Sequence, residues 1–207
     1  RTVLQTVPDF AAAERAAGVP VVLAVNAAPW EPFVPGKTFA HADRMGLLID
    51  DGVVVCPPAP DRPSLLIGHD GRAALRAVAP GDDLTAIETA VSGFSFCLVD
   101  GVPSPPDDVL HPRTGFGVSA DGKTLFILVA DGRQAASQRL TVREVGELLR
   151  DIGADDGINM DGGGSTTLVA QVPGGDDLRL VNRPSGGLRR NGANLVIGID
   201  GAPAGRE

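Results

Sequence analysis

Lysine is almost absent from this chain of 207 residues: Lys37 and Lys123 are the only two, and arginine supplies the other cationic side chains. The formal net charge is −8. This acidic balance argues against a nucleic-acid binder, because such proteins gain much of their affinity from counterion release by basic residues. Arginine presents a planar fork that binds phosphate through two parallel hydrogen bonds. A phosphate site in this chain would therefore have to gather its arginines locally.

Cysteine is equally scarce, with Cys56 and Cys97 as the only two. They do not form a Cys-x-x-Cys pair, which argues against a zinc site. They fit either one disulfide or two small buried thiols, and the second interpretation is the simpler one. No apolar run approaches the roughly 20 residues of a membrane-spanning helix, so we expect no membrane span. The chain begins at Arg1 rather than Met, and we expect removal of an export signal or another upstream segment.

Two common motifs are missing as well. There is no G-x-G-x-x-G of a dinucleotide site and no G-x-S-x-G nucleophile turn. A serine hydrolase built from Ser165 and His111 remains only as a minor alternative. The chain has no repeat of fixed length. With 43% hydrophobic residues, a single domain over residues 1–207 is expected, with its core over about residues 19–199.

The residue pattern predicts three helices, over residues 9–18, 82–91 and 141–152. Asp9 is the expected N-cap of the first helix, and Thr141 with Glu144 predicts a capping box at the start of the third. Residues 19–25 form an apolar run typical of a buried strand, which delivers Asn26 to its end. Four further pairs of short apolar runs flank turn sequences that end in glycine, at residues 50–52, 69–71, 100–101 and 121–122. We therefore expect an α+β fold, with a mixed, mainly antiparallel β-sheet built from hairpins and about three helices.

The stretch from Gly157 to Val169 has the most unusual composition, and it reads GINMDGGGSTTLV. An apolar run ends on Asp161, three glycines follow, and three hydroxyl residues precede the next β-branched run. Glycine triplets are costly to order, so they indicate a sharp turn or the close approach of a ligand to the backbone. Hydroxyls beside free backbone N–H groups are typical of a cradle for an anion. We expect a ligand at this turn.

Other polar clusters lie at the ends of predicted strands. Trp30, the only tryptophan, follows Asn26 in an irregular segment, where it fits a sugar-stacking platform and a loop anchor equally well. The remaining clusters are His111-Pro112-Arg113-Thr114, Asp131-Gly132-Arg133-Gln134 with Ser137, Asn182-Arg183-Pro184-Ser185, and Arg190 with Asn194. Each one alone fits an ordinary loop. Arginine recurs at these junctions, however, and such junctions can converge on one end of a sheet.

Together with Asn159 to Thr167, these clusters appear in the order seen in the phosphodiester glycosidase family, which the chain resembles from about Val19 to Ile199. The resemblance implies an enzyme that releases a sugar from a sugar-1-phosphodiester, leaving a phosphomonoester. It implies a small-molecule or glycan substrate that carries a phosphodiester-linked sugar. It also implies a secreted or cell-envelope protein, with exopolysaccharide among the candidate substrates. No cofactor is expected.

The resemblance also implies roles for the residues that match it. Asp161 would activate water or stabilise an oxocarbenium-like sugar, with Asp131 as a second carboxylate and His111 as a proton donor or phosphate ligand. The substrate-binding residues would be Arg113, Thr114, Arg133, Ser137, Gly162, Gly163, Gly164, Ser165, Thr166, Asn26, Asn182, Arg183 and Arg190. Arg113 and Arg133 would grip the phosphate. The chain departs from the family pattern after Asn26, where Ala27 and Ala28 precede Pro29 and Trp30, and at Arg139, which replaces a common glycine.

Two other functions use the same residues. A non-catalytic module that binds phospho-glycans or exopolysaccharide would need the arginines and the glycine turn, but no carboxylate. A metal-dependent phosphodiesterase would use Asp131 and Asp161 as ligands and attack phosphorus. The chain lacks the usual spacing of metal-ligating histidines and aspartates, which favours glycosidic cleavage over the metal-dependent reaction. A structural calcium ion stays compatible with the sequence.

Overall fold

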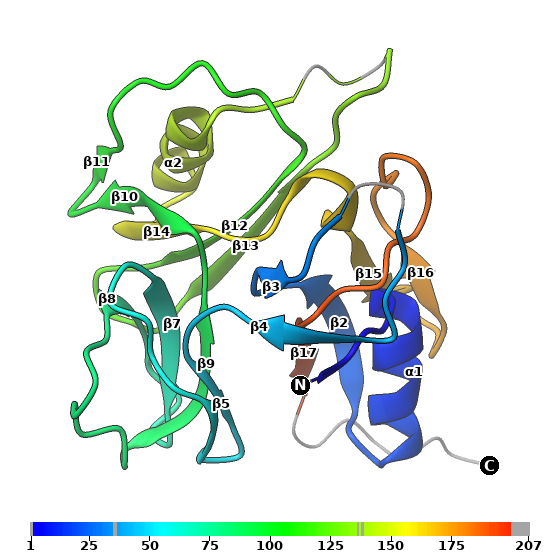
Figure 1. The fold of residues 1–207 in the computed structure, drawn as a ribbon, viewed down its shortest axis with the longest axis horizontal. Helices are drawn as coiled ribbons and strands as arrows, with labels where there is room; N and C mark the ends of the chain where they lie inside the picture. Colours follow the sequence, from blue (N-terminus) through cyan, green and yellow to red (C-terminus); the bar gives the residue numbers. More distant parts are fainter. Residues whose placement is uncertain (1, 35–36, 136, 138, 200–207) are drawn as a thin grey trace.

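The computed structural model describes residues 2–34, 37–135, 137 and 139–199 (Figure 1). Within these ranges it contains two α-helices, α1 (Val7–Ala16) and α2 (Val142–Asp151), and one short 3₁₀ helix, η1 (Gly163–Ser165). The strands are β1 (Thr2–Val3), β2 (Val21–Asn26), β3 (Trp30–Glu31), β4 (His41–Arg44), β5 (Leu48–Asp50), β6 (Val53–Cys56), β7 (Pro63–Gly68), β8 (Ala73–Ala77), β9 (Ile87–Ser92), β10 (Ser95–Val99), β11 (Val102–Pro103), β12 (Arg113–Val118), β13 (Leu125–Ala130), β14 (Asp156–Asn159), β15 (Leu168–Gln171), β16 (Leu178–Leu180) and β17 (Asn194–Gly198).

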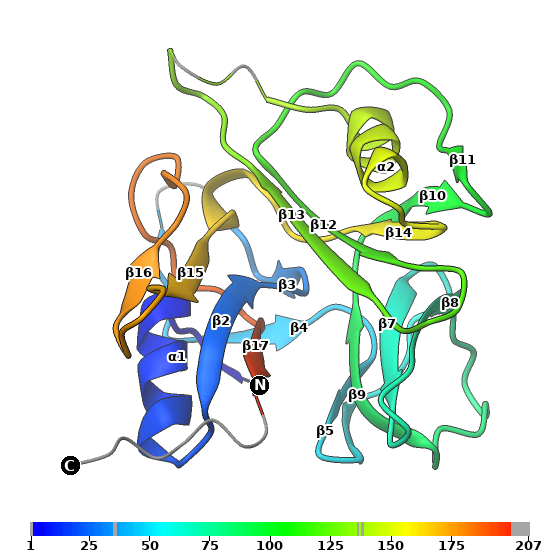
Figure 2. The same ribbon diagram turned by 180° about the vertical axis from the view of Figure 1, so that it is seen from behind.

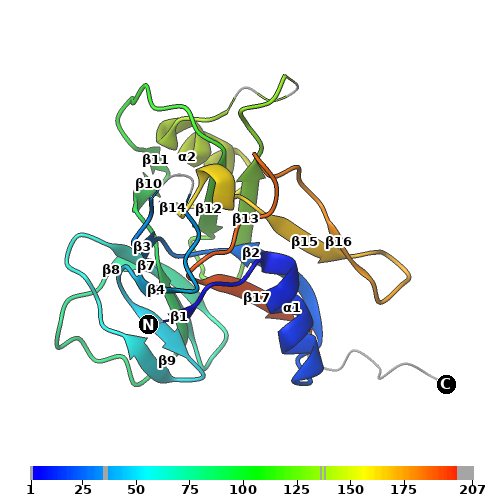
Figure 3. The same cartoon turned by 45° about the vertical axis from the view of Figure 1, so that its right-hand side comes forward.

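These strands form four sheets, and every strand pair in them is antiparallel. Their strand orders are β16-β15-β2-β17, β11-β10-β14-β12-β13, β6-β5-β9-β7-β8 and β1-β4-β3. Helix α1 packs along β2 and its neighbours, and α2 packs on the β10–β14–β12 sheet (Figures 1 and 3). The view from behind shows these two sheets and the β5–β9 sheet meeting around the centre of the molecule (Figure 2). The expected α+β architecture of antiparallel hairpins is confirmed at this level.

The four hairpins lie where the turn sequences predict them. They are β5–β6, β7–β8, β10–β11 and β12–β13. Short polar turns ending in glycine allow the chain to reverse because glycine tolerates positive φ, as at Gly52 with φ 74° and Gly122 with φ 69°. The predicted strand over residues 19–25 is β2, and it pairs with β15 on one side and β17 on the other.

One predicted helix is wrong. Residues 82–84 have no regular secondary structure, residues 85–86 form a turn, and Ile87–Ser92 is strand β9 between β5 and β7. The acidic residues that suggested a helix start instead make local bonds: the Asp83 carboxylate accepts from the Thr85 backbone N–H and hydroxyl, and Asp82 accepts from the Ala79 N–H. Such bonds compete with helix formation. The β-branched residues that follow fit a pleated strand, so the helix count is two rather than three.

The N-cap of α1 is also not the predicted one. Thr6 caps the helix by accepting from the Asp9 N–H at 3.2 Å, and Asp9 lies inside the first turn. Pro8 fits that first turn because its missing N–H would have no partner there. The predicted Asp9 cap therefore lies three residues too late.

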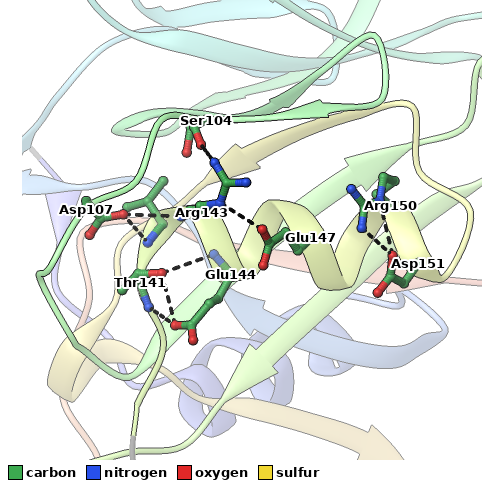
Figure 4. Close-up of polar contacts among 9 residues, drawn as sticks. Ser104, Asp107, Thr141, Arg143, Glu144, Glu147, Arg150 and Asp151 are labelled. Carbon is green, nitrogen blue, oxygen red and sulfur yellow. Dashed lines mark hydrogen bonds and ion pairs between the residues drawn. The ribbon is translucent and has the colours of Figure 1, made fainter.

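Helix α2 begins at the predicted capping box. The Thr141 hydroxyl accepts from the Glu144 N–H, and the Glu144 carboxylate accepts from the Thr141 N–H at 2.8 Å (Figure 4). Asp107 adds a second cap from outside the helix by accepting from the N–H groups of Val142 and Arg143 at 2.9 and 3.2 Å. The segment before β12 is thereby fastened to the helix that covers its sheet.

The buried face of α2 is narrower than the apolar pattern predicts. Val145, Gly146 and Leu149 are buried, whereas Leu148 and Ile152 are exposed at 42% and 55%. The reason is close packing at one glycine, because a Cβ at Gly146 would lie 2.0 Å from the Cys97 carbonyl oxygen of β10. The backbone of α2 packs directly against β10 at Gly146, and the side chains on either side of this contact point away from the sheet.

The largest core cluster joins side chains of the three main sheets. Val25, Leu65, Val91, Phe116 and Ile158 pack together in it. The cluster also includes Met160, the residue before Asp161. The predicted carboxylate is therefore anchored directly to the core.

Both cysteines are free thiols. Cys97 is buried, and burial raises its pKa to about 12. Among the residues that the structure describes, no helix is long and apolar enough to cross a membrane.

Gly146→Ala should destabilise the protein, although alanine normally favours an exposed helix position by up to about 1 kcal/mol. The added methyl would collide with the β10 backbone, and we expect a loss of about 1–3 kcal/mol in the free energy of unfolding. Urea titration measures it. Gly175→Ala is the matched control, because a Cβ there would meet nothing within 4 Å. Equal or greater stability of the Gly146 variant would contradict this packing.

Candidate functional site

The glycine turn lies in the wall of a cleft of about 990 Å³. The walls come from segments that are far apart in the sequence: residues 29–30, 33–34 and 37–39, His111 and Arg113 around the start of β12, Arg133 after β13, residues 160–165, and residues 185–190. Leu4, Thr6 and Phe94 complete the lining. Within the described residues, the cleft carries one carboxylate, that of Asp161, and its cations are Lys37, Arg113, Arg133, Arg189 and Arg190. In a chain of net charge −8, this is a local concentration of positive charge.

The position of Asp161 is fixed by the buried side chain of Asn26, at the end of β2. Its Nδ2 donates to the Asp161 carbonyl at 2.6 Å. Its Oδ1 accepts from the Thr114 hydroxyl at 2.9 Å and from the Thr167 N–H at 3.0 Å. The Asp161 N–H in turn donates to the Ala27 carbonyl. One amide thus ties β2, β12 and both ends of the glycine turn together.

Asp161 is half-buried, and burial of its carboxyl raises its pKa to about 6. The Ser165 hydroxyl, the Arg189 guanidinium, the Gly162 N–H and the Trp30 indole favour the charged form and limit this rise. The Ser165 hydroxyl is buried and lies outside ordinary hydrogen-bond geometry to every described protein atom, so it approaches the carboxylate without a full hydrogen bond. A carboxyl group with a pKa near 6 can act as acid or base close to neutral pH.

The three glycines allow other chain segments to approach the turn. A Cβ at Gly162 would lie 2.7 Å from the Pro112 carbonyl oxygen, and one at Gly164 would lie 2.3 Å from the Arg189 guanidinium. Gly163 has φ 63° and lies beneath Arg133. The N–H groups of Gly163 and Ser165 donate to the Pro112 and Gly162 carbonyls. The expected cradle of free N–H groups is therefore not present at these two positions, and the glycines serve mainly to admit arginine side chains.

His111 and Arg133 form a pair at the cleft. Arg133 Nη2 lies 3.2 Å from His111 Nδ1. Because a guanidinium only donates, Nδ1 must accept, which assigns the imidazole proton to Nε2. Burial, followed by the charges of Arg113, Arg133 and Arg139, lowers the pKa of His111. Both effects favour the neutral imidazole, which can donate from Nε2.

Arg113 is held more tightly than a surface arginine. Its Nε donates to the Leu140 carbonyl at 3.0 Å, Nη2 to the Val109 carbonyl at 2.6 Å, and Nη1 approaches Asn159 Oδ1 at 3.5 Å. Burial lowers the pKa of its guanidinium. Of the five N–H donors of an arginine, about two are left for a ligand. Arg113 thus contributes a fixed charge with limited capacity for direct binding.

Asp131 lies in a separate network beside the cleft. Its carboxylate accepts from Asn182 Nδ2 at 2.8 Å and from the Arg183 N–H at 2.9 Å. Asn182 also donates to the Thr166 carbonyl, and the Ser137 hydroxyl donates to the Asp131 carbonyl. This network joins the loop after β13 to the loop after β16. The Asp131 carboxylate is not part of the described lining of the cleft.

The predicted site residues therefore fall into three groups. The cleft is lined by His111, Arg113, Arg133, Asp161, Gly162, Gly163, Gly164, Ser165 and Arg190. Asn26, Thr114 and Thr166 are buried behind the turn. Asp131, Ser137, Asn182 and Arg183 connect the neighbouring loops.

Arg189 is the main residue that sequence reasoning missed. It lies against Gly164, influences Asp161, and its guanidinium carbon is 4.9 Å from the centre of the Phe33 ring. Its neighbour Arg190 was the predicted residue, and the two glycines before Leu188 are the sequence signal that this loop could turn both arginines toward one cleft. Trp30 is 9% exposed and packs with Leu4 and Ala42, so it anchors the loop, and it also lines the cleft.

Among the described residues, no group of three His, Cys, Asp or Glu side chains is placed to hold a metal ion. Asp131 and Asp161, the pair that a metal-dependent reaction would need, do not line a common cleft. The site chemistry on view consists of one carboxyl group, one neutral imidazole and several guanidinium groups.

A model of the phosphodiester glycosidase family matches residues 20–198. The catalytic domain of zebrafish N-acetylglucosamine-1-phosphodiester alpha-N-acetylglucosaminidase, auto-inhibited by its pro-peptide, is similar with a TM-score of 0.69 and 20% identity, over 95% of this chain and 67% of that one. A hypothetical protein from Synechocystis has a TM-score of 0.67 at 13% identity, over 95% of this chain and 54% of that one. A candidate exported protein from Burkholderia pseudomallei K96243 has a TM-score of 0.62 at 17% identity, over 94% and 68%. No curated protein sequence matches significantly.

Asp161→Asn should stabilise the protein at pH 8. The pKa of Asp161 is raised from 3.8 to about 6, so the folded state binds more protons than the unfolded state between about pH 4 and pH 6. Stability therefore falls as the pH rises through this window and then levels off. A neutral amide avoids the loss, and we expect a gain of about 1–3 kcal/mol at pH 8 that disappears near pH 4. Denaturant titrations at both pH values measure it.

Asp177→Asn is the matched control, because Asp177 is exposed and its carboxylate makes no hydrogen bond or ion pair among the described residues. It should show no pH-dependent difference from the unchanged protein. Equal stability of the Asp161 variant and the unchanged protein at pH 8 would contradict the conclusion that burial raises the pKa of Asp161.

Proposed function

Because the chain belongs to the phosphodiester glycosidase family, we propose that its cleft hydrolyses the glycosidic bond of a sugar-1-phosphodiester. The bond between the anomeric carbon and the phosphate oxygen breaks, and water supplies a hydroxyl to the carbon. The products are a free sugar and a phosphomonoester. The protein is thus a hydrolase of the glycosidase type, and its partner is a small molecule or glycan with a phosphodiester-linked sugar.

The observation that carries this proposal is the placement of a single perturbed carboxyl group among guanidinium groups. Asp161 lines the same cleft as Arg133 and Arg189. A sugar phosphodiester needs both features: positive charge for its phosphate, and a carboxylate for the anomeric carbon, which becomes cationic in the transition state. A simple anion-binding pocket would have no use for a carboxylate whose ionisation costs stability.

We assign the phosphate to the region around Arg133. Its guanidinium lies over the glycine turn beside His111, and Arg113 lines the same cleft. The neutral His111 can donate its Nε2 proton to a phosphate oxygen, and a bound anion would raise its pKa. Charge develops on the leaving phosphate oxygen, and each preorganised donor aimed there contributes about 3–4 kcal/mol in favourable sites.

We assign Asp161 to the attack of water or to stabilisation of the oxocarbenium-like sugar. Phosphate is a better leaving group than a sugar alkoxide, so proton donation to it matters less. At pH 7 a carboxyl with a pKa near 6 is mostly ionised, as these roles require. The buried Ser165 hydroxyl lies close to this carboxyl and favours its charged form.

The remaining predicted residues act as supports in this proposal. Asn26 and Thr114 hold the Asp161 backbone, and Thr166 anchors the turn through its carbonyl. Asp131 serves here to join the two loops rather than as a second acid, with Asn182 and Ser137 as its partners. The aromatic wall of Trp30, Phe33, Phe39 and Phe94 offers apolar surface to a sugar ring. A secreted or envelope location belongs to the same proposal, and the candidate exported neighbour supports it.

Asp161→Asn should abolish sugar release, with a fall of about 10³-fold or more in kcat, because the amide can neither take a proton nor supply charge. The assay measures free sugar and phosphomonoester from a sugar-1-phosphodiester, with Asp177→Asn as control. In the unchanged enzyme, kcat/KM should fall as the pH drops through about 6, since protonation removes the active carboxylate. Near-normal turnover by a folded Asp161 variant would remove the assignment.

The same assay separates the alternatives. Loss of activity in a chelator, or phosphate left on the sugar, would indicate a metal-dependent reaction at phosphorus. Retained binding without turnover over a panel of sugar phosphodiesters would indicate a binding module.

Arg133→Lys should lower kcat/KM by about 10- to 100-fold, although the charge is kept, because lysine cannot bind phosphate through a planar fork. Arg179→Lys is the control: Arg179 is exposed on β16 and does not line the cleft. Initial rates against substrate concentration measure both variants. A change of less than twofold for Arg133 would show that its contact is a simple point charge or does not exist.

A further inference from the structure

A second cleft of about 730 Å³ adjoins the first. Its lining comprises Arg133, Gln134, Ala135, Leu180 and residues 183–188. Arg133 and residues 185–188 also line the first cleft, so the two clefts share one wall and one cation. None of the residues that line the second cleft is an aspartate or a glutamate. Nothing in the reaction at Asp161 requires this cleft.

The shared residue Arg133 decides how a substrate would lie. Its guanidinium nitrogen Nη2 lies over Gly163 and contacts His111, and both of these residues belong to the first cleft or its glycine turn. A phosphodiester has a sugar on one side of the phosphate and the aglycone, the group that remains on the phosphate, on the other. If Arg133 holds the phosphate and the sugar lies toward Asp161 and the aromatic wall, the aglycone must leave the first cleft next to Arg133. The second cleft shares Arg133 with the first, and its lining contains neither Asp161 nor the aromatic residues, so it offers the space for this group.

We propose that the second cleft is the aglycone subsite, and that it takes an aglycone with a further anionic group, a second phosphate or a carboxylate. This inference rests on the proposed function. The charge comes from Arg183, whose side chain is exposed and makes no hydrogen bond or ion pair among the described residues. In a chain of net charge −8, a cleft that combines two arginines with no acid in its lining selects for anions.

The backbone around Arg183 is fixed before any ligand arrives. Asp131 accepts from the Arg183 N–H at 2.9 Å, and Gln134 donates from its side chain to the Arg183 carbonyl. Asp131 is itself held by Asn182. These bonds use the Asp131 carboxylate on backbone and amide groups, so it orients Arg183 without forming an ion pair with the guanidinium. A preorganised cation binds an anion at lower entropic cost.

The remaining lining suits the carbon skeleton between the two anionic groups. Ala135, Leu180, Pro184 and Leu188 give the cleft apolar surface. An aglycone of a few carbons with a terminal anion could lie along this surface and reach Arg183. A preference for an anionic aglycone distinguishes this site from one that binds only the sugar and the phosphodiester.

The test compares Arg183→Ala with the unchanged enzyme on three sugar-1-phosphodiesters, whose aglycones are propyl, 3-phosphopropyl and 3-carboxypropyl. We expect kcat/KM for the anionic aglycones to fall about tenfold, as for loss of a hydrogen bond between charged groups, and the propyl substrate to change less than twofold. The effect should lie mainly in KM. Arg183→Glu should enlarge it. The phosphate and carboxylate arms show which anion is preferred.

Arg179→Ala is the matched control, because Arg179 is on the same strand as Leu180 but its side chain points to the opposite face. It should leave all three substrates unchanged. Equal losses on the propyl and anionic substrates, or no loss on any, would overturn the subsite while leaving the proposed reaction intact.

A binding experiment separates this inference from the reaction. Calorimetry with propyl phosphate and 1,3-propanediol bisphosphate should show tighter binding of the bisphosphate, and Arg183→Ala should remove that difference. If no substrate turns over and the difference is present, the anion subsite stands and the glycosidase proposal fails. Equal affinities of the two ligands would overturn the subsite.

Discussion

The Asn26 side chain is the constraint on which the rest of the site depends. It is fully buried, and its three hydrogen bonds reach the Asp161 carbonyl, the Thr114 hydroxyl and the Thr167 N–H. Each of these groups would be buried without a partner if the amide moved, at a cost of about 1–3 kcal/mol apiece. The end of β2, the start of β12 and the glycine turn are therefore held in one arrangement. The carboxyl of Asp161 is consequently fixed where the core ends and the cleft begins.

The site combines two opposing electrostatic effects. Burial makes ionisation of Asp161 costly, while Arg189 and the hydroxyl of Ser165 make it more favourable. Several arginines in one cleft repel each other, and after burial their charges also lower the pKa of His111. An anionic ligand relieves the repulsion, so the empty cleft is less favourable electrostatically than the filled one. Such a site lowers the stability of the folded protein. In return, its charges match a phosphate beside an anomeric carbon that becomes positive in the transition state.

Sequence reasoning succeeded where the signal is local and failed where it is not. The hairpins and the Thr141 capping box follow from residues that contact their own neighbours, and both are confirmed. The helix predicted over residues 82–91 was wrong, because acidic residues before an apolar run are typical of a helix start. In the structure these acidic residues accept hydrogen bonds in turns, and the apolar run pairs with β5 and β7. Arg190 was predicted and Arg189 was not, because the sequence does not distinguish two adjacent arginines in a loop. Only the structure shows that Arg189 packs against Gly164 and Phe33. Asp131 and Asp161 likewise look equivalent as carboxylates at strand ends.

The amino-acid sequence by itself determined the residue types and the order of the clusters: the glycine triplet after Asp161, the arginines at strand–loop junctions, and the family that the chain resembles. These are properties of short segments, in which backbone freedom and hydrogen-bonding capacity do not depend on distant residues. Only the tertiary structure decided which carboxylate lines the cleft, which arginines remain free to bind, and that a second cleft adjoins the first at Arg133. Those properties arise because antiparallel pairing across separate sheets brings together side chains more than a hundred residues apart, as between Asn26 and Asp161, and burial then assigns each a different environment.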